Sequence, residues 1–156
     1  VSYVGRSSGI RDRVLNINET ADVWSYAYGN NLLTLSSIYN RRIMVICLVF
    51  GCRQQEARLS TWDEWDLKNW VWTVPKEHSK NKEAIVRPVP DGIKQWIVNL
   101  YAETKNRGYV VGCALQRATI TGAANRICRR LGHDTNGLWC IRLMIWGRIL
   151  ILSNFF

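Results

Sequence analysis

An apolar run that ends at an arginine constrains the fold of this chain more than any other feature. Residues Ile43 to Phe50 are all apolar, and Gly51-Cys52-Arg53 follows directly. Together with its polar start, the run predicts a buried helix from Ser37 to Phe50. An arginine at the end of such a helix is costly to bury unless its guanidinium group meets a fixed anion, and its planar fork suits phosphate oxygens. Glu56, one helical turn further, is placed to hold the Arg53 side chain.

Four further segments have the apolar spacing of helices. The first is capped by Asn18 and ends at Gly29-Asn30-Asn31 in left-handed geometry, and the second is a short helix from Arg53 to Ser60. The third is capped by Asp91 and has an apolar stripe at Ile93, Trp96, Ile97, Leu100 and Tyr101. The fourth runs from Thr119 to Leu131 and is ended by Gly132. The cap residues and the glycines set these boundaries, because their backbones favour the turns that begin and end helices.

Between the second and third of these helices, the pattern changes to that of a β-hairpin. Trp70, Trp72 and Val74 recur at every second position and face a returning segment with Ile85 and Val89. Such alternation predicts a half-buried antiparallel pair. The turn between the strands is polar and carries three lysines. The expected fold class is therefore α+β, mostly helical with a small antiparallel sheet or hairpin.

Composition limits the domain count and the partners. A chain of 156 residues with 47% hydrophobic content can bury one core, so residues 1–156 are expected to form a single domain. Twenty-one Lys and Arg against twelve Asp and Glu give a net charge of +9, which favours polyanions. Charge alone does not separate DNA from RNA or from an acidic membrane.

Two function classes are disfavoured by the sequence. The roughly 20 uninterrupted apolar residues that a membrane span needs are not found, and no secretory signal opens the chain, so we expect a cytoplasmic protein without membrane contact. The five cysteines (Cys47, Cys52, Cys113, Cys128 and Cys140) are odd in number and include no C-x-x-C pair. We expect reduced thiols and no metal site.

The order of these motifs resembles the catalytic domain of the tyrosine recombinases, the phage and prophage integrase family. The resemblance lies in Gly51, Arg53 and Glu56, then in Trp62 and Asp66-Leu67, and then in a lysine-bearing hairpin that ends in Val89-Pro90. It covers about residues 38–90 well, and residues 38–137 are the best supported part of the expected domain. The resemblance implies double-stranded DNA as the partner, DNA integration by strand cleavage and rejoining, and no cofactor.

Three residues take roles from this resemblance. Arg53 matches the first catalytic arginine, which binds the scissile phosphate and stabilises charge in the transition state. Lys80 matches the hairpin lysine, a general acid on the leaving 5′ oxygen, and Glu56 supports Arg53. The alternatives stay open: Arg53 as a surface arginine paired with Glu56, and Lys80 as a solvated turn lysine equivalent to Lys76 or Lys82.

Further cations are expected to contact backbone phosphates. They are Lys76, Lys82, Arg87, Arg126, Arg129 and Arg130. His78 could contact phosphate, but a lone loop histidine is more often solvated. His133 lies too early for the catalytic box of the family and receives little catalytic weight. The tryptophans occupy periodic apolar positions, so core packing explains them better than base stacking.

The catalytic set is incomplete. The family needs an H-x-x-R box and then a nucleophilic tyrosine, but no such box occurs here and no tyrosine follows Tyr109. No acidic residue follows Asp134, and the atypical tail 138–156 suggests out-of-frame sequence. We therefore expect a recombinase fragment that is inactive alone and whose intact relatives pair with other recombinase subunits. The alternatives are a noncatalytic basic nucleic-acid-binding module and a truncation that inhibits a full-length recombinase.

Overall fold

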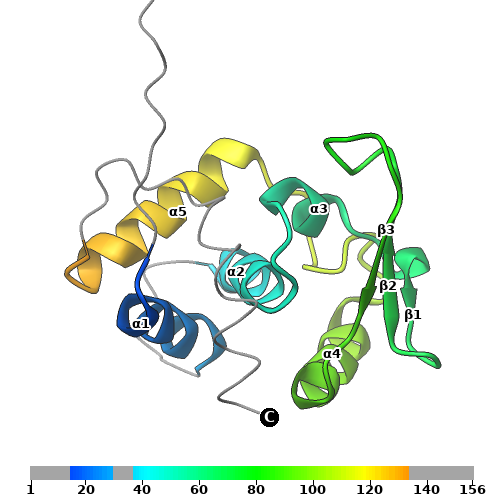
Figure 1. Ribbon diagram of the computed structural model, residues 1–156, viewed down its shortest axis with the longest axis horizontal. Helices are drawn as coiled ribbons and strands as arrows, with labels where there is room; N and C mark the ends of the chain where they lie inside the picture. Colours follow the sequence, from blue (N-terminus) through cyan, green and yellow to red (C-terminus); the bar gives the residue numbers. More distant parts are fainter. Residues whose placement is uncertain (1–14, 30–36, 134–156) are drawn as a thin grey trace, which may run out of the picture.

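The computed structural model describes residues 15–29 and 37–133, which form an α+β fold (Figure 1). Within these residues the elements are α1 (Ile17–Tyr28), α2 (Ile38–Phe50), α3 (Gln54–Leu59), the 3-10 helix η1 (Trp62–Glu64), β1 (Trp65–Asp66), β2 (Val71–Val74), β3 (Ile85–Pro88), α4 (Asp91–Thr104) and α5 (Arg117–Arg130). The α+β class with a small antiparallel sheet is thus confirmed.

Helix α2 forms the centre of the core. Every residue from Ile43 to Phe50 is buried, and α2 packs against α1, α3 and α5. Figure 1 shows α2 between α1 and α5 on one side and α4 with the sheet on the other. Ser37 begins the helix by accepting a hydrogen bond from the Asn40 N–H at 3.4 Å. Gly51 ends it with a φ of 57°, a left-handed conformation that glycine adopts without strain.

Helix α1 begins two residues earlier than expected. Its cap is Asn16, not Asn18: Asn16 Oδ1 accepts from the Glu19 N–H, and Glu19 Oε2 accepts from the Asn16 N–H, both at 2.9 Å. This capping box satisfies two otherwise unpaired donors, which an isolated Asn18 cap could not do. Gly29 has a φ of −70° and so does not end the helix in left-handed geometry. Asn30 and Asn31 lie outside the described residues.

The sheet has the antiparallel order β1-β2-β3, with Trp72 opposite both Trp65 and Arg87. The predicted hairpin corresponds to β2 and β3, whereas β1, only two residues long, was not anticipated. Trp65 and Trp72 stack with ring centroids 4.9 Å apart, and Phe50 of α2 meets both rings edge-on. Aromatic packing therefore fixes the sheet against α2, as expected for core tryptophans.

The two remaining helices largely follow their predicted stripes, with small shifts at their starts, although Tyr101 of the α4 stripe is exposed. In α4, Ile93, Ile97 and Leu100 are buried, and Pro90 is the cap residue, so Asp91 lies in the first turn and pairs with Lys94 instead of capping. Helix α5 starts at Arg117, two residues before the expected start at Thr119, and Gly132 follows it with a φ of +79°.

The cysteines within the described residues are Cys47, Cys52, Cys113 and Cys128, and all four are free; Cys140 lies outside them. No group of three or more possible metal ligands occurs in residues 15–29 and 37–133. None of the helices described in these ranges is long and apolar enough to cross a bilayer.

Candidate functional site

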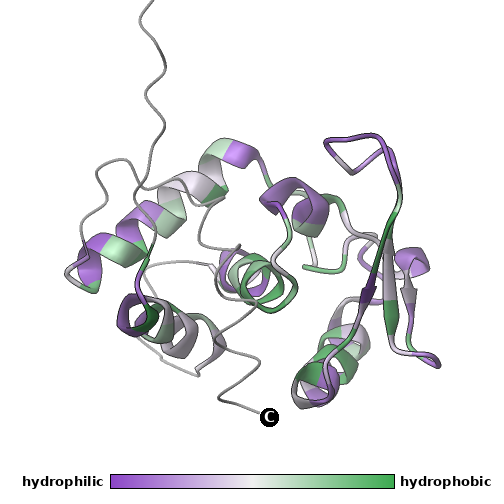
Figure 2. Ribbon diagram, in the orientation of Figure 1, coloured by the Kyte–Doolittle hydropathy of each residue, from purple (hydrophilic) through white to green (hydrophobic). Residues whose placement is uncertain are grey.

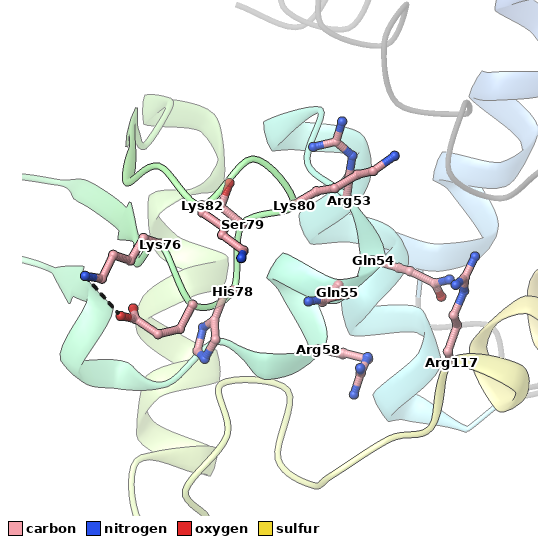
Figure 3. A pocket seen from close by; sticks show the side chains of 11 residues that line it. Arg53, Gln54, Gln55, Arg58, Lys76, His78, Ser79, Lys80, Lys82 and Arg117 are labelled. Carbon is pink, nitrogen blue, oxygen red and sulfur yellow. Dashed lines mark ion pairs between the residues drawn. The ribbon is translucent and has the colours of Figure 1, made fainter.

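A pocket of about 870 Å³ lies between α3, the loop that joins β2 to β3, and the start of α5 (Figure 3). Its lining is strongly cationic. The basic side chains are Arg53, Arg58, Lys76, Lys80, Lys82 and Arg117. Glu77 is the acidic side chain of the lining, and it lies 4.0 Å from the Lys76 ammonium group. Figure 2 shows the same hydrophilic character along the hairpin loop and α3, in contrast to the hydrophobic turns of α2. Such a surface suits an anion.

Arg53 reaches the pocket because it stands at the boundary between two helices. After the left-handed turn at Gly51, Arg53 has extended backbone angles and caps α3. Its side chain is 43% exposed, and its Nη1 lies 3.8 Å from Glu56 Oε1. This contact agrees with both hypotheses for Arg53: a phosphate ligand that Glu56 supports, and a surface arginine that is simply paired with Glu56. The exposed side chain leaves guanidinium donors for a ligand.

Glu56 is a buried carboxylate next to Arg53. It is 1% exposed, and its Oε2 accepts a hydrogen bond from Arg87 Nη2 at 2.7 Å. Arg87, which was expected among the phosphate contacts, is itself buried; it donates to the Phe50 carbonyl at 3.4 Å and lies over the Trp72 ring. The alternation of β3 turns Val86 outward and Arg87 inward. Arg87 is therefore held in the core by Glu56, and it is not among the residues that line the pocket.

Lys80 and Lys82 lie on the loop opposite α3, as the hairpin predicts. Both are exposed and both line the pocket with Arg53. In the view of Figure 3 the Lys80 side chain extends toward Arg53. Backbone hydrogen bonds from Ser79 to the Pro75 carbonyl and from Lys82 to the Ser79 carbonyl, at 3.2 and 3.3 Å, give the loop a defined turn. The structure thus brings the two expected catalytic residues to one cavity.

His78 connects this loop to the sheet. Its Nδ1 lies 2.8 Å from Glu64 Oε1, and Glu64 Oε2 accepts from Trp72 Nε1 at 3.0 Å and from Ser60 Oγ at 3.1 Å. His78 is therefore not merely solvated. Sequence analysis did not consider Glu64, although its position three residues after Thr61 fits a capping box, which the structure contains.

Of the remaining cations expected to contact phosphates, one lines the pocket and three lie outside it. Lys76 lines the pocket, whereas Arg126, Arg129 and Arg130 are exposed on α5 and do not line it. Arg58 and Arg117 line the pocket, and sequence analysis missed both. Arg58 follows Arg53 by five residues, a spacing that does not place two side chains on one face of a helix, so no local pattern indicated it.

His133 has a structural position. Its Nδ1 lies 3.8 Å from Glu19 Oε1 and its Nε2 lies 3.3 Å from Asp22 Oδ2. Through these contacts His133, which follows α5 and is 11% exposed, joins the end of α5 to α1. It is not among the residues that line the pocket. The tail 138–156 lies outside the described residues.

Comparison with known proteins finds neither a family model nor a curated protein that matches this chain.

Proposed function

We propose that this chain binds the phosphodiester backbone of double-stranded DNA in the cationic pocket, as part of a catalytic domain of the tyrosine recombinase kind. The observation that carries the proposal is the convergence of Arg53, from the start of α3, and Lys80, from the hairpin loop, on one cavity. The resemblance to recombinases pairs the same two residues on one scissile phosphate. Motif order singles out Arg53 and Lys80, and both side chains line one cavity together with four other Lys and Arg side chains.

In this proposal the Arg53 guanidinium binds the non-bridging phosphate oxygens, and Glu56 limits its motion from below. Lys80 approaches the 5′ oxygen; a lysine in this position donates a proton to that leaving oxygen when a nucleophile, which this chain lacks, attacks the phosphorus. Charge that develops on the phosphorus centre is stabilised by guanidinium donors fixed before the reaction. The site needs no metal or nucleotide for these roles.

The proposed activity of this chain is binding without strand exchange. A covalent 3′-phosphotyrosine requires a tyrosine after the H-x-x-R box, and residues 110–156 contain neither. With Arg53 and Lys80 in place, the chain would orient a phosphodiester but lack the nucleophile that attacks it.

Substitution of Arg53 tests the phosphate contact. We expect Arg53→Gln to weaken binding to a 20-base-pair DNA duplex by roughly 10-fold or more, because a charge-assisted hydrogen bond to phosphate is lost. The slope of log K against log salt should also decrease by about one. Fluorescence anisotropy over a salt series measures both. Arg126→Gln, which removes the same charge from outside the pocket, is the matched control; an equal effect of the two substitutions would contradict the proposal.

A cleavage assay tests the expected incapacity. When the chain is incubated with nicked duplexes that trap covalent intermediates, we expect no protein–DNA adduct on a denaturing gel. An intact tyrosine recombinase on its own nicked site provides the positive control. An adduct formed by this chain would show that a nucleophile exists within its 156 residues.

A noncatalytic basic module remains the second candidate, favoured by the exposed Arg126, Arg129 and Arg130 of α5. A module that holds nucleic acid through general charge would treat these arginines and Arg53 alike. The anisotropy comparison above therefore separates the two functions, and the same series with a duplex RNA probe shows whether DNA is preferred.

A further inference from the structure

The pocket has a second end that the proposed roles of Arg53 and Lys80 do not use. Gln54 and Arg58 of α3 and Arg117, the first residue of α5, form this end (Figure 3). The volume of about 870 Å³ lies in the upper part of the range of roughly 300–1,000 Å³ that small-molecule sites occupy. It exceeds the space that one phosphate group fills.

Gln54 is the most informative residue of this end. It is 3% exposed, and neither its Nε2 nor its Oε1 has a hydrogen-bond partner among the described residues. Buried amides are nearly always hydrogen-bonded, because an unpaired one loses its interactions with water without replacement. In Figure 3 the Gln54 side chain points toward Arg117, within the lining of the pocket. Its carboxamide therefore lies at the wall of the pocket, covered and without a protein partner, and a movement of this side chain would bring it to a ligand.

The start of α5 adds positive potential. Its first turn has no capping side chain and no acidic residue. The first N–H groups of a helix have no carbonyl partner within the helix, and the helix dipole favours an anion at this end. Arg58 Nη1 donates to the Leu115 carbonyl at 3.3 Å, which holds its guanidinium group beside the segment that leads into α5. Arg58 and Arg117, the first residue of α5, thus line the same end of the pocket.

We infer that Gln54, Arg58, Arg117 and the first turn of α5 bind a second phosphate of the DNA strand whose neighbouring phosphate contacts Arg53 and Lys80. In the complex with DNA, Gln54 Nε2 would donate to a phosphate oxygen, and Gln54 Oε1, which is unpaired in the structure, would accept from the Arg117 guanidinium. Two phosphate contacts fix the path of a strand across the pocket, whereas one contact lets it rotate. This inference rests on the proposed function for the identity of the ligand.

Two substitutions test the second phosphate site in the full 156-residue chain. With a 20-base-pair DNA duplex in 0.1 M salt, we expect Arg117→Gln to weaken binding about 10-fold and to lower the salt slope by about one. Gln54→Leu should weaken binding several-fold with no change in salt slope, because it removes a neutral donor. It should leave the thermal unfolding temperature unchanged or raise it, since an unpaired buried amide is replaced by an apolar group. A purely structural role of Gln54 would lower that temperature.

Arg126→Gln is the matched control, because it removes the same charge from the same helix outside the pocket. Equal effects of Arg117→Gln and Arg126→Gln, together with unchanged binding by Gln54→Leu, would overturn the inference. If Arg53→Gln weakens binding while the Gln54 and Arg117 variants do not, the second site is wrong and the proposed function stands. If the Gln54 and Arg117 variants weaken binding while Arg53→Gln does not, the phosphate site stands and the recombinase-like role of Arg53 is wrong.

Discussion

At the scale of single residues, one buried carboxylate links the core to a side chain that lines the pocket. Glu56 Oε2 accepts a hydrogen bond from Arg87 Nη2 at 2.7 Å in the core, and Glu56 Oε1 lies 3.8 Å from Nη1 of the half-exposed Arg53 at the surface. A carboxylate with this burial is costly unless its partners satisfy it. Glu56 therefore couples the stability of the sheet, through Arg87, to the position of the side chain that we propose as the phosphate ligand.

Removal of Glu56 should be strongly destabilising. We expect Glu56→Ala to lower the free energy of unfolding by roughly 3–5 kcal/mol, because Arg87 would remain buried without a counter-charge. Urea denaturation followed by circular dichroism measures the loss. Glu77→Ala, at an exposed glutamate of the hairpin loop, should change it by no more than about 0.5 kcal/mol. Similar losses in the two variants would show that the Glu56–Arg87 pair contributes little.

At the scale of elements, the helix boundaries follow from local hydrogen bonds. The capping box of Asn16 and Glu19 begins α1, and a comparable box of Thr61 and Glu64 begins η1. In the second box the same glutamate also contacts His78 of the hairpin loop. A local device that begins a helix thus also positions a loop of the candidate site.

The cap of α1 can be tested with two asparagines that lie close together. Asn16→Ala should destabilise the protein by about 1 kcal/mol, because the Glu19 N–H loses its acceptor. Asn18→Ala, two positions later on the exposed surface of α1, should change stability by no more than about 0.5 kcal/mol. Thermal unfolding of both variants makes the comparison. A larger loss at Asn18 than at Asn16 would contradict the observed cap.

At the scale of the whole molecule, α2 fixes the relative positions of the elements that form the site. It packs against α1, α3 and α5, and its Phe50 meets the stacked tryptophans of the sheet. The pocket lies where α3, the hairpin loop and the start of α5 meet. The rigidity of the site therefore depends on a core to which no pocket residue belongs.

A cavity in α2 should reduce stability throughout the domain. Ile46 is 0% exposed, so we expect Ile46→Ala to cost about 2–5 kcal/mol in lost burial and residual cavity. Ile38→Ala on the same helix removes a side chain that is 46% exposed and should cost much less. Urea denaturation compares the two variants. Equal costs would mean that α2 is not the centre of the core.

Local patterns in the sequence determined the main elements of this protein. Apolar periodicity indicated α2, α4 and α5, and the alternation of Trp72 and Val74 indicated the hairpin, because residues close in the chain decide which side of a helix or strand is apolar. The Arg53 and Lys80 positions followed from motif order. Both residues are indeed found in one pocket.

Tertiary structure alone decided the rest. The pairing of β3 with β2 turned Arg87 inward to Glu56, and the packing of α3 against α5 brought Arg58 and Arg117 to the pocket from distant positions in the chain. The two-residue strand β1 and the contact between Glu64 and His78 also depend on which segments meet. A sequence pattern shows that a charged residue lies on a strand or helix. Only the packing of that element determines whether the charge meets a buried partner or an open pocket.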